Sequence, residues 1–240
     1  MKKISSKVFC NVISNVVIVS LIALVFCAGF AFNTLSTAFF QDNTKPIYHG
    51  NKEVKKVSLM INVYWGTEFI EPMLTTLDKY DVKVTFFVGG SWVAKNTETF
   101  LKIVTAGHEI GNHVYFHKDH ARLDYDGNYN EIAVTHKLVK ELTGIEMFLF
   151  APPSGSFATT TLKVADELNY QTIMWSKDTI DWRDKDENLV LARATKNLEN
   201  GDLILMHPTQ HTLNALENIL IKIKQNEFSA VRVSENINFQ

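Results

Sequence analysis

The sequence has little cysteine, and it lacks the features that would place it in several common classes of protein. Only two of its 240 residues are cysteines, Cys10 and Cys27. Both lie in an apolar N-terminal run, so the rest of the chain can form no internal disulfide. No Gly-x-Gly-x-x-Gly motif follows the first expected strand, so dinucleotide binding has no support. We also find no internal repeat and no low-complexity tract.

Positive charge is scarce after the N-terminus. The chain has 24 Lys and Arg side chains against 26 Asp and Glu, and Lys2, Lys3 and Lys7 all precede the apolar run. The remainder is mildly acidic and has no basic patch, so we do not expect nucleic acid as a partner. With 46% hydrophobic residues, the chain is long enough for one globular domain with a full core.

The first 40 residues contain no acidic side chain and carry an apolar run from about Val8 to Phe32. A helix of about 25 apolar residues spans a bilayer, so we expect residues 1–33 to be an uncleaved signal anchor. The lysines before it should stay in the cytoplasm, which places the domain outside the cell membrane. Gly29-Phe30-Ala31 has the small residues of a processing site, so a secreted form cleaved near Ala31 is the alternative. Residues 34–53 are expected to form a polar linker.

From residue 54 onward, short β-rich runs alternate with amphipathic helical stretches. We expect strands at 57–63, 82–88, 108–111, 147–151, 170–175, 203–206 and 230–233. We expect helices at 71–80, 97–106, 130–142, 159–168, 189–198 and 212–226, with Pro72 in the first turn of the first helix. This alternation predicts an α/β fold with a parallel sheet covered by helices, either open and doubly wound or closed as a barrel.

Polar residues follow four of the expected strands, at the end where a βα barrel carries its active site. After one strand, His113 and His117 are four residues apart and can face the same way, as two imidazole ligands of a divalent metal do. Ordinary surface or capping histidines are the alternative. The other three groups are Ala151-Pro152-Pro153-Ser154-Gly155, Asp178-Thr179-Ile180-Asp181-Trp182 and Leu205-Met206-His207.

This order and spacing resemble the polysaccharide deacetylase family, the NodB-homology domain of carbohydrate esterase family 4, over residues 54–237. The stretches Val84-Thr85-Phe86-Phe87-Val88 and Gly107-His108-Glu109-Ile110-Gly111-Asn112-His113 are also similar to that family. The resemblance implies a distorted (β/α)7 barrel and metal-dependent removal of acetyl groups from a glycan. It implies that His113 and His117 bind the metal, commonly zinc. It also implies that His207 is the general acid and that Asp181 and Trp182 orient it.

The first strand departs from the family pattern. Where the family has two adjacent aspartates followed by glycine, this chain reads Asn62-Val63-Tyr64-Trp65-Gly66. We interpret Asn62 as standing at the position of the catalytic base and Val63 at that of the metal-binding carboxylate. Neither an amide nor an isopropyl group can replace a carboxylate in these roles. Ala151 replaces the arginine that holds the catalytic aspartate. The chain resembles a sporulation-associated branch with a similar replacement, and we expect its catalysis to be weak or lost.

These residues leave three functions open. The first is a membrane-tethered, extracytoplasmic deacetylase of N-acetylated cell-wall glycan such as peptidoglycan, with Glu68 or Glu71 as a substitute metal ligand. The second is a non-catalytic protein that binds the same glycan, which we favour. The third is a hydrolase of altered chemistry that uses Glu68. The aromatic residues that could stack on sugar rings, if they are not core residues, are Trp65, Trp92 and Tyr115.

Overall fold

The computed structural model of the chain describes residue 15, residues 18–25 and residues 44–238. Residue 15 and residues 18–25 are helical. None of the helices in these described ranges is long and apolar enough to cross a membrane. Most of the predicted signal anchor, the processing site at residues 29–31 and the first half of the predicted linker, residues 34–43, lie outside the described residues. The chain divides into two units, Met1–Asp42 and Asn43–Gln240, and the fold described below belongs to the second.

The second unit is built on one sheet of eight strands in the order β5-β4-β3-β2-β1-β7-β6, with β8 paired to the start of β1. All of its strand pairs are parallel. The strands are β1 (Lys56–Val63), β2 (Thr85–Val88), β3 (Glu109–Asn112), β4 (Leu149–Phe150), β5 (Gln171–Thr172), β6 (Lys177–Asp178), β7 (Asp202–Met206) and β8 (Ser229–Ala230). The predicted α/β fold with a parallel sheet is confirmed.

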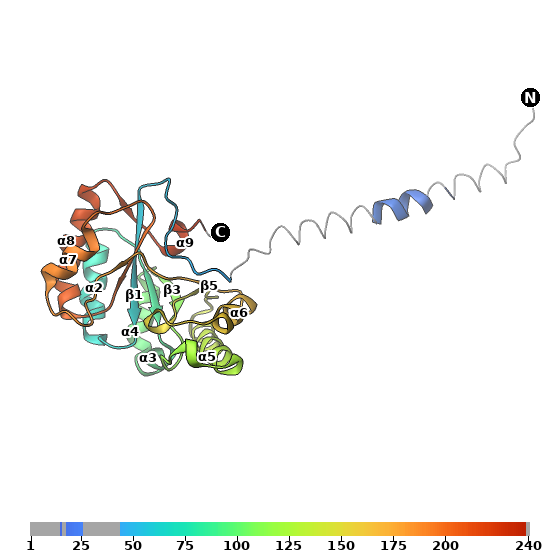
Figure 1. Cartoon of the computed structure of the whole chain (residues 1–240), viewed down its shortest axis with the longest axis horizontal. Coiled ribbons are helices and arrows are strands. Elements are labelled where there is room, and N and C mark those ends of the chain that lie inside the picture. Colours follow the sequence, from blue (N-terminus) through green and yellow to red (C-terminus); the bar gives the residue numbers. More distant parts are fainter. Residues whose placement is uncertain (1–14, 16–17, 26–43, 239–240) are drawn as a thin grey trace, which may run out of the picture. The chain divides into compact units, whose positions relative to one another are not determined.

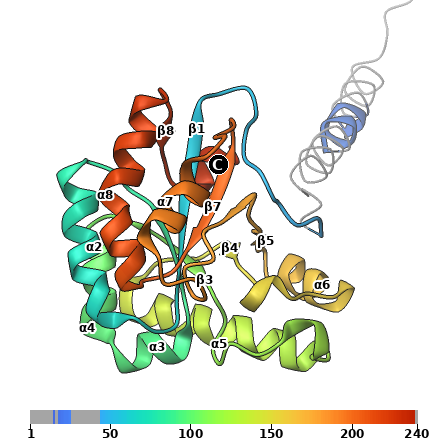
Figure 2. The same cartoon turned by 60° about the vertical axis from the view of Figure 1, so that its left-hand side comes forward.

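Helices connect the strands and cover the sheet, with α2, α7 and α8 grouped on one side in both views (Figure 1, Figure 2). The helices are α2 (Thr67–Lys79), α3 (Gly90–Lys95), α4 (Thr97–Thr105), α5 (Tyr125–Thr143), α6 (Thr159–Glu167), α7 (Glu187–Thr195), α8 (Gln210–Gln225) and α9 (Val233–Asn236). Helix α2 begins four residues earlier than predicted, so Pro72 lies inside the helix and not in its first turn. The prediction for Pro72 was wrong because Gly66, in a left-handed conformation, caps the helix directly after β1.

The two faces of β1 belong to two different cores. Val57, Leu59, Ile61 and Val63 pack with the helices in the larger core, whereas Met60 belongs to a smaller core with Phe87, Leu149 and Leu203 from neighbouring strands. The side chains of a strand alternate between its faces, so the even-numbered residues of β1 point to the inner face of the sheet. This alternation decides which residues at the end of β1 face the inner side of the sheet and which face the helices.

The chain before β1 brings the edges of the sheet together. Ile47 pairs in parallel with Ile173, next to β5, and His49 pairs with Asp202 at the start of β7. One short segment therefore contacts strands that are far apart in the sheet order, so the sheet is curled. Residues 44–53, which the sequence assigns to a linker, take part in the fold, and the domain begins before residue 54.

Candidate functional site

A cavity of about 340 Å³ opens at the carboxyl ends of the central strands. The four groups singled out in the sequence contribute to it, from the segments after β3 and β4, from β6 with the segment after it, and from the end of β7. The end of β1 and the segment after β5 complete it. It is lined by Asn62, Tyr64, Trp65, His113, His117, Ser154, Trp175, Asp178, Trp182, Leu205 and His207. Residues separated by up to 145 positions in the sequence thus meet at one edge of the sheet, as a parallel α/β fold predicts.

His113 is buried directly after β3, with 2% of its surface exposed. Its Nδ1–H donates to the carbonyl oxygen of Ala151 at 2.8 Å, which leaves Nε2 as the unprotonated ring nitrogen. Burial, followed by the proximity of His117, lowers the pKa of His113 to about 3. Ala151 is therefore at the site, where its backbone fixes the tautomer of His113.

His117 lies in the irregular segment after β3, where both Val114 and His117 have positive φ values. Its ring contacts those of His113 and Tyr64, with centroids 5.0 and 5.1 Å away. Burial also lowers the pKa of His117. The predicted histidine pair is thus brought together, in an irregular segment after β3. Two neutral imidazoles meet there beside a phenol.

The Tyr64 ring is held in place by neighbouring residues. The hydroxyl of Ser91 donates to the Tyr64 hydroxyl at 2.8 Å. A Cβ atom at Gly89 would lie 2.3 Å from the Tyr64 ring, so glycine at that position makes room for it. The aromatic side chain beside His117 is therefore held on two sides, by a hydrogen bond and by a close backbone contact.

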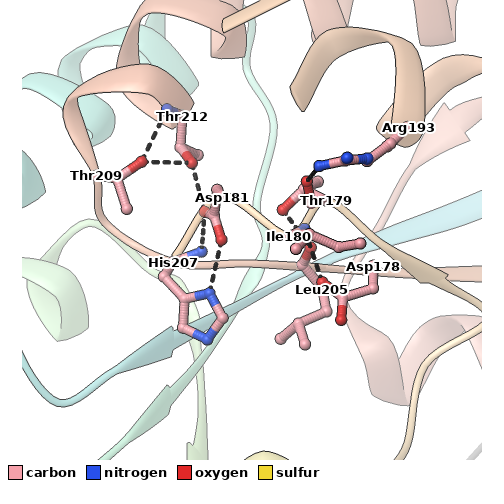
Figure 3. Close-up of polar contacts among 9 residues, drawn as sticks. All are labelled: Asp178, Thr179, Ile180, Asp181, Arg193, Leu205, His207, Thr209 and Thr212. Atoms are coloured by element: carbon pink, nitrogen blue, oxygen red, sulfur yellow. Dashed lines mark hydrogen bonds and ion pairs between the residues drawn. The ribbon is translucent and has the colours of Figure 1, made fainter. Parts of the chain in front are cut away.

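His207 is held by a buried carboxylate (Figure 3). Asp181 accepts hydrogen bonds from the backbone N–H of His207 at 2.6 Å and from its Nδ1 at 2.8 Å. The Thr212 hydroxyl donates to the same carboxylate at 2.5 Å, and Thr209 caps helix α8 beside it. These bonds fix the imidazole and leave Nε2 for the cavity, so His207 is placed to move a proton there. This geometry agrees with the predicted pairing of Asp181 with His207.

The ring that packs on His207 is Trp65, stacked at 5.7 Å with an interplanar angle of 13°. Trp182, which the resemblance assigns to this role, instead lies 56% exposed at the cavity with the Arg183 guanidinium 5.9 Å from its ring centre. The resemblance gives Asp181 and Trp182 one shared role, and only Asp181 is hydrogen-bonded to His207. Asp181 orients His207 by hydrogen bonds, and Trp182 lines the cavity.

Val63 does not line the cavity. Its side chain is fully buried on the helix-facing side of β1, while Asn62 and Tyr64 point to the inner face and Trp65 follows the strand end. The interpretation of Val63 as the replaced metal ligand was wrong, because it assigned the wrong face of the strand. The residues beside the histidines at the end of β1 are Tyr64 and Trp65. The buried Oδ1 of Asn62 makes no hydrogen bond within the described part of the chain.

These residues do not fit the metal that the resemblance implies. A catalytic zinc commonly takes three protein ligands, and no group of three or more His, Cys, Asp or Glu side chains within the described ranges could hold an ion. Glu68 is exposed in the first turn of α2 and does not line the cavity, and Glu71 pairs with Lys102 at 2.7 Å. Neither supplies the missing carboxylate, so we derive no step through a metal.

Two residues of the cavity, Tyr64 and Trp175, were not singled out in the sequence. Tyr64 could have been found by continuing the alternation of β1 one residue past its end, since it lies two positions after Asn62. Trp175 ends a predicted strand, but its apolar side chain carries no distinctive signal. Trp92 is in the core, and Tyr115 does not line the cavity. Of the three predicted stacking aromatics, only Trp65 is at the site.

The curled parallel sheet, the histidine pair and the carboxylate-bound imidazole together define an α/β protein of the glycan deacetylase type. The family model described as polysaccharide deacetylase matches residues 49–173. The chain therefore belongs to the polysaccharide deacetylase family.

Three relatives show where the chain stands in this family. It is 39% identical to the uncharacterized protein YlxY of Bacillus subtilis over 80% of this chain and 60% of that protein. It is 32% identical to a peptidoglycan-N-acetylglucosamine deacetylase of Bacillus cereus over 65% of this chain and 59% of that one. The chain thus spans less than two thirds of the length of these relatives. The structure of a CE4 family pseudoenzyme from Bacillus anthracis matches with a TM-score of 0.79 and 38% identity over 81% of this chain and 69% of that one. A mutant of that pseudoenzyme has restored enzymatic activity.

Proposed function

We propose that the chain is a membrane-tethered, extracytoplasmic protein that binds cell-wall glycan in the cavity at the carboxyl ends of its strands and no longer deacetylates it. The observation that carries this proposal is the pair Tyr64 and Trp65 at the end of β1, beside His117 and His207. The N-terminal apolar run after three lysines supports the tether. The peptidoglycan deacetylases among the relatives support the choice of glycan.

Loss of catalysis follows from the chemistry of those two side chains. Hydrolysis of an acetamide needs a base that takes a proton from water, and the hydroxyl of a phenol is a hydrogen-bonding group with none of the basicity of a carboxylate. An indole ring has no basic nitrogen lone pair to offer. A positioned general base is worth roughly 10²- to 10⁴-fold in rate. The cavity does contain one carboxylate, Asp178, but it comes from β6 and does not form a metal-binding cluster with the histidines.

Binding follows from the same substitutions. Trp65, Trp175 and Trp182 all line the cavity, and flat indole rings bury large apolar areas against a ligand. Because three of the four tryptophans of the chain face this one cavity, a sugar bound there should change the intrinsic fluorescence. His207 Nε2 and the Ser154 side chain offer polar partners beside the rings.

One observation favours a second function, an active de-N-acetylase. Protonation of a leaving amine needs an oriented general acid, and the hydrogen-bonded pair of Asp181 and His207 supplies one. Such an enzyme would need a base and a third ligand that the described residues do not place at the histidine pair. Use of Glu68 would require the start of α2 to move.

The test compares binding with turnover on the full chain in detergent micelles. We expect N-acetylglucosamine oligomers or peptidoglycan fragments to change the tryptophan fluorescence, with no acetate released when zinc, cobalt or manganese is supplied. Trp182→Ala should weaken binding about threefold to tenfold, as expected for one lost stacking ring. Tyr48→Ala, which removes an exposed aromatic ring that does not line the cavity, should leave binding unchanged. Acetate release that His207→Ala abolishes would instead establish the de-N-acetylase.

A further inference from the structure

The cavity has an unusual charge for a site that is expected to hold a neutral sugar. No Lys or Arg side chain lines it. With histidine counted as neutral at pH 7, its single formal charge among the described lining residues is the negative one of Asp178. A neutral N-acetylated sugar gains little from an unpaired carboxylate. A cationic ligand gains a charge-assisted hydrogen bond.

Asp178 is fixed in the fold and keeps one oxygen available. It lies in β6, opposite Leu205 of β7, and its Oδ1 accepts a hydrogen bond from the backbone N–H of Ile180 at 2.8 Å (Figure 3). Within the described part of the chain, its Oδ2 makes no hydrogen bond or ion pair. The carboxylate is therefore oriented by one oxygen, and the other is left for a ligand.

Aromatic rings surround the same space. Trp65, Trp175, Trp182 and Tyr64 line the cavity together with Asp178. The face of an indole attracts a cation within about 6 Å of its centre, most strongly where the cation is desolvated. Trp182 already has a cation near one face, because the Arg183 guanidinium lies 5.9 Å from the ring. Arg183 and Arg193 are both paired with Asp184, at 2.9 and 2.6 Å, and neither arginine lines the cavity.

We propose that the cavity selects glycan residues that have already lost the acetyl group and carry a free ammonium, over their N-acetylated counterparts. This inference rests on the proposed glycan-binding function and names its ligand. The ammonium of a glucosamine-type residue would donate to Asp178 Oδ2 and lie among the indole faces, whereas a neutral acetamido group can use neither interaction as fully. The reaction class that supplies this ligand is hydrolytic de-N-acetylation, so the protein recognises the product of an active deacetylase.

The experiment compares two tetrasaccharides that differ only in acetylation, a glucosamine tetramer and an N-acetylglucosamine tetramer. Titrations use the full chain in detergent micelles at pH 7, below the pKa of about 7.7 to 8.0 of an ordinary α-amino group, which we take as a guide for the sugar amine. Tryptophan fluorescence and calorimetry measure both affinities. We expect the wild-type chain to bind the glucosamine tetramer about tenfold more tightly, which corresponds to about 1.4 kcal/mol.

Two substitutions that each remove one negative charge, one inside the cavity and one outside it, test whether Asp178 causes the preference for the glucosamine tetramer. Asp178→Asn keeps the acceptor for the Ile180 N–H and should reduce the ratio of the two affinities to below about twofold. Glu187→Gln removes an exposed carboxylate in the first turn of α7, outside the cavity, and should keep the tenfold ratio. Trp182→Leu, at a ring that is 56% exposed, tests the aromatic contribution independently of Asp178 and should lower the ratio about threefold.

The outcomes separate this inference from the function on which it rests. If neither tetramer binds, the glycan-binding function fails. If both bind and the acetylated tetramer binds as tightly or more tightly, the glycan-binding function stands and the selectivity is overturned. A preference that survives in both Asp178→Asn and Trp182→Leu but disappears in Glu187→Gln would show general attraction to an acidic chain, which also overturns the proposed site.

Discussion

Two walls of the cavity differ in how completely their polar groups are paired. The dyad wall consists of Asp181, His207 and Thr212, and its carboxylate accepts three hydrogen bonds of 2.5 to 2.8 Å. The pair wall consists of His113, His117 and Tyr64, and its contacts are mostly between rings. One wall of the cavity keeps a complete polar network, while the other has an aromatic ring where a carboxylate would be needed.

The difference shows that an intact network is poor evidence for activity. Asp181 is buried, and a buried carboxylate that loses its donors destabilises the fold by several kcal/mol. The dyad wall is therefore maintained by the requirements of folding, whether or not His207 transfers a proton. Trp65 is 45% exposed at the edge of the cavity, where a change of residue type has little effect on the core. Catalytic groups can be lost there without loss of the fold.

The largest effect is expected from returning carboxylates to the end of β1. In the double variant Tyr64→Asp with Trp65→Asp, two carboxylates would face the histidine pair from positions that line the cavity. We expect this variant to gain zinc binding, measured by calorimetry. We also expect acetate release from N-acetylglucosamine oligomers to rise about 10²-fold or more above the wild-type chain.

The matched control is Asn62→Asp with Val63→Asp, which adds the same charge two residues earlier in the chain. Val63 is fully buried among apolar side chains, so its replacement by aspartate should destabilise the chain by about 3 kcal/mol or more, measured by urea unfolding. The assignment of Tyr64 and Trp65 to the site would be wrong if this control gained activity and the first variant did not.

Asp181→Ala tests the structural role of the dyad wall. Removing the carboxylate leaves the His207 N–H and the Thr212 hydroxyl without their acceptor, so we expect a loss of about 3 to 5 kcal/mol in the free energy of unfolding. Asp178→Ala removes an acceptor for a single backbone N–H and should cost about 1 kcal/mol. Equal losses for the two variants would contradict the view that folding maintains the dyad.

Glu131→Ala makes the corresponding test of the pair wall. Glu131 of α5 is 3% exposed, accepts hydrogen bonds from the backbone N–H groups of Tyr115 and Phe116, and pairs with Lys118 at 2.9 Å. Its loss should cost about 2 to 3 kcal/mol and speed amide exchange between His113 and Lys118. Lys118→Ala removes only the half-exposed partner and should cost less than about 1 kcal/mol. Unchanged exchange in Glu131→Ala would show that the turn holds His117 without this carboxylate.

The sequence predicts the alternation of strands and helices and the four strand ends that meet at the cavity. Apolar runs and glycine-terminated helices are local signals, as the helix that ends at Gly144 illustrates. The face of β1 could not be predicted in the same way. All but the first of its residues are buried, so its two sides have no contrast of polarity, and an error of one position exchanges the faces. This is why Val63 was assigned to the site and Tyr64 was missed.

The partners of the site residues are likewise set by tertiary structure. Nothing local to Trp65 or His207 indicates that these two rings stack, since they come from opposite parts of the chain. The backbone of Ala151 holds His113 through its carbonyl oxygen, which is independent of the side chain at that position. Sequence patterns identify such residues by type, whereas their contacts depend on how the parallel strands are placed side by side.

The pH dependence of stability gives the smallest effect and applies to the pair wall. The pKa of buried His113 is about 3, below the value of about 6.5 for an unfolded histidine. As the pH falls below 6.5, His113 is protonated in the unfolded chain but stays neutral in the folded chain. This difference makes the folded state progressively less stable down to about pH 3. Between pH 6.5 and 5 its contribution is a loss of about 2 kcal/mol in the free energy of unfolding.

His113→Gln, which can still donate to Ala151, should make the unfolding free energy less dependent on pH over this range. Urea unfolding curves at pH 5, 6 and 7 measure the slope, and a variant with the wild-type slope would show that His113 takes up its proton in the folded chain as readily as in the unfolded one.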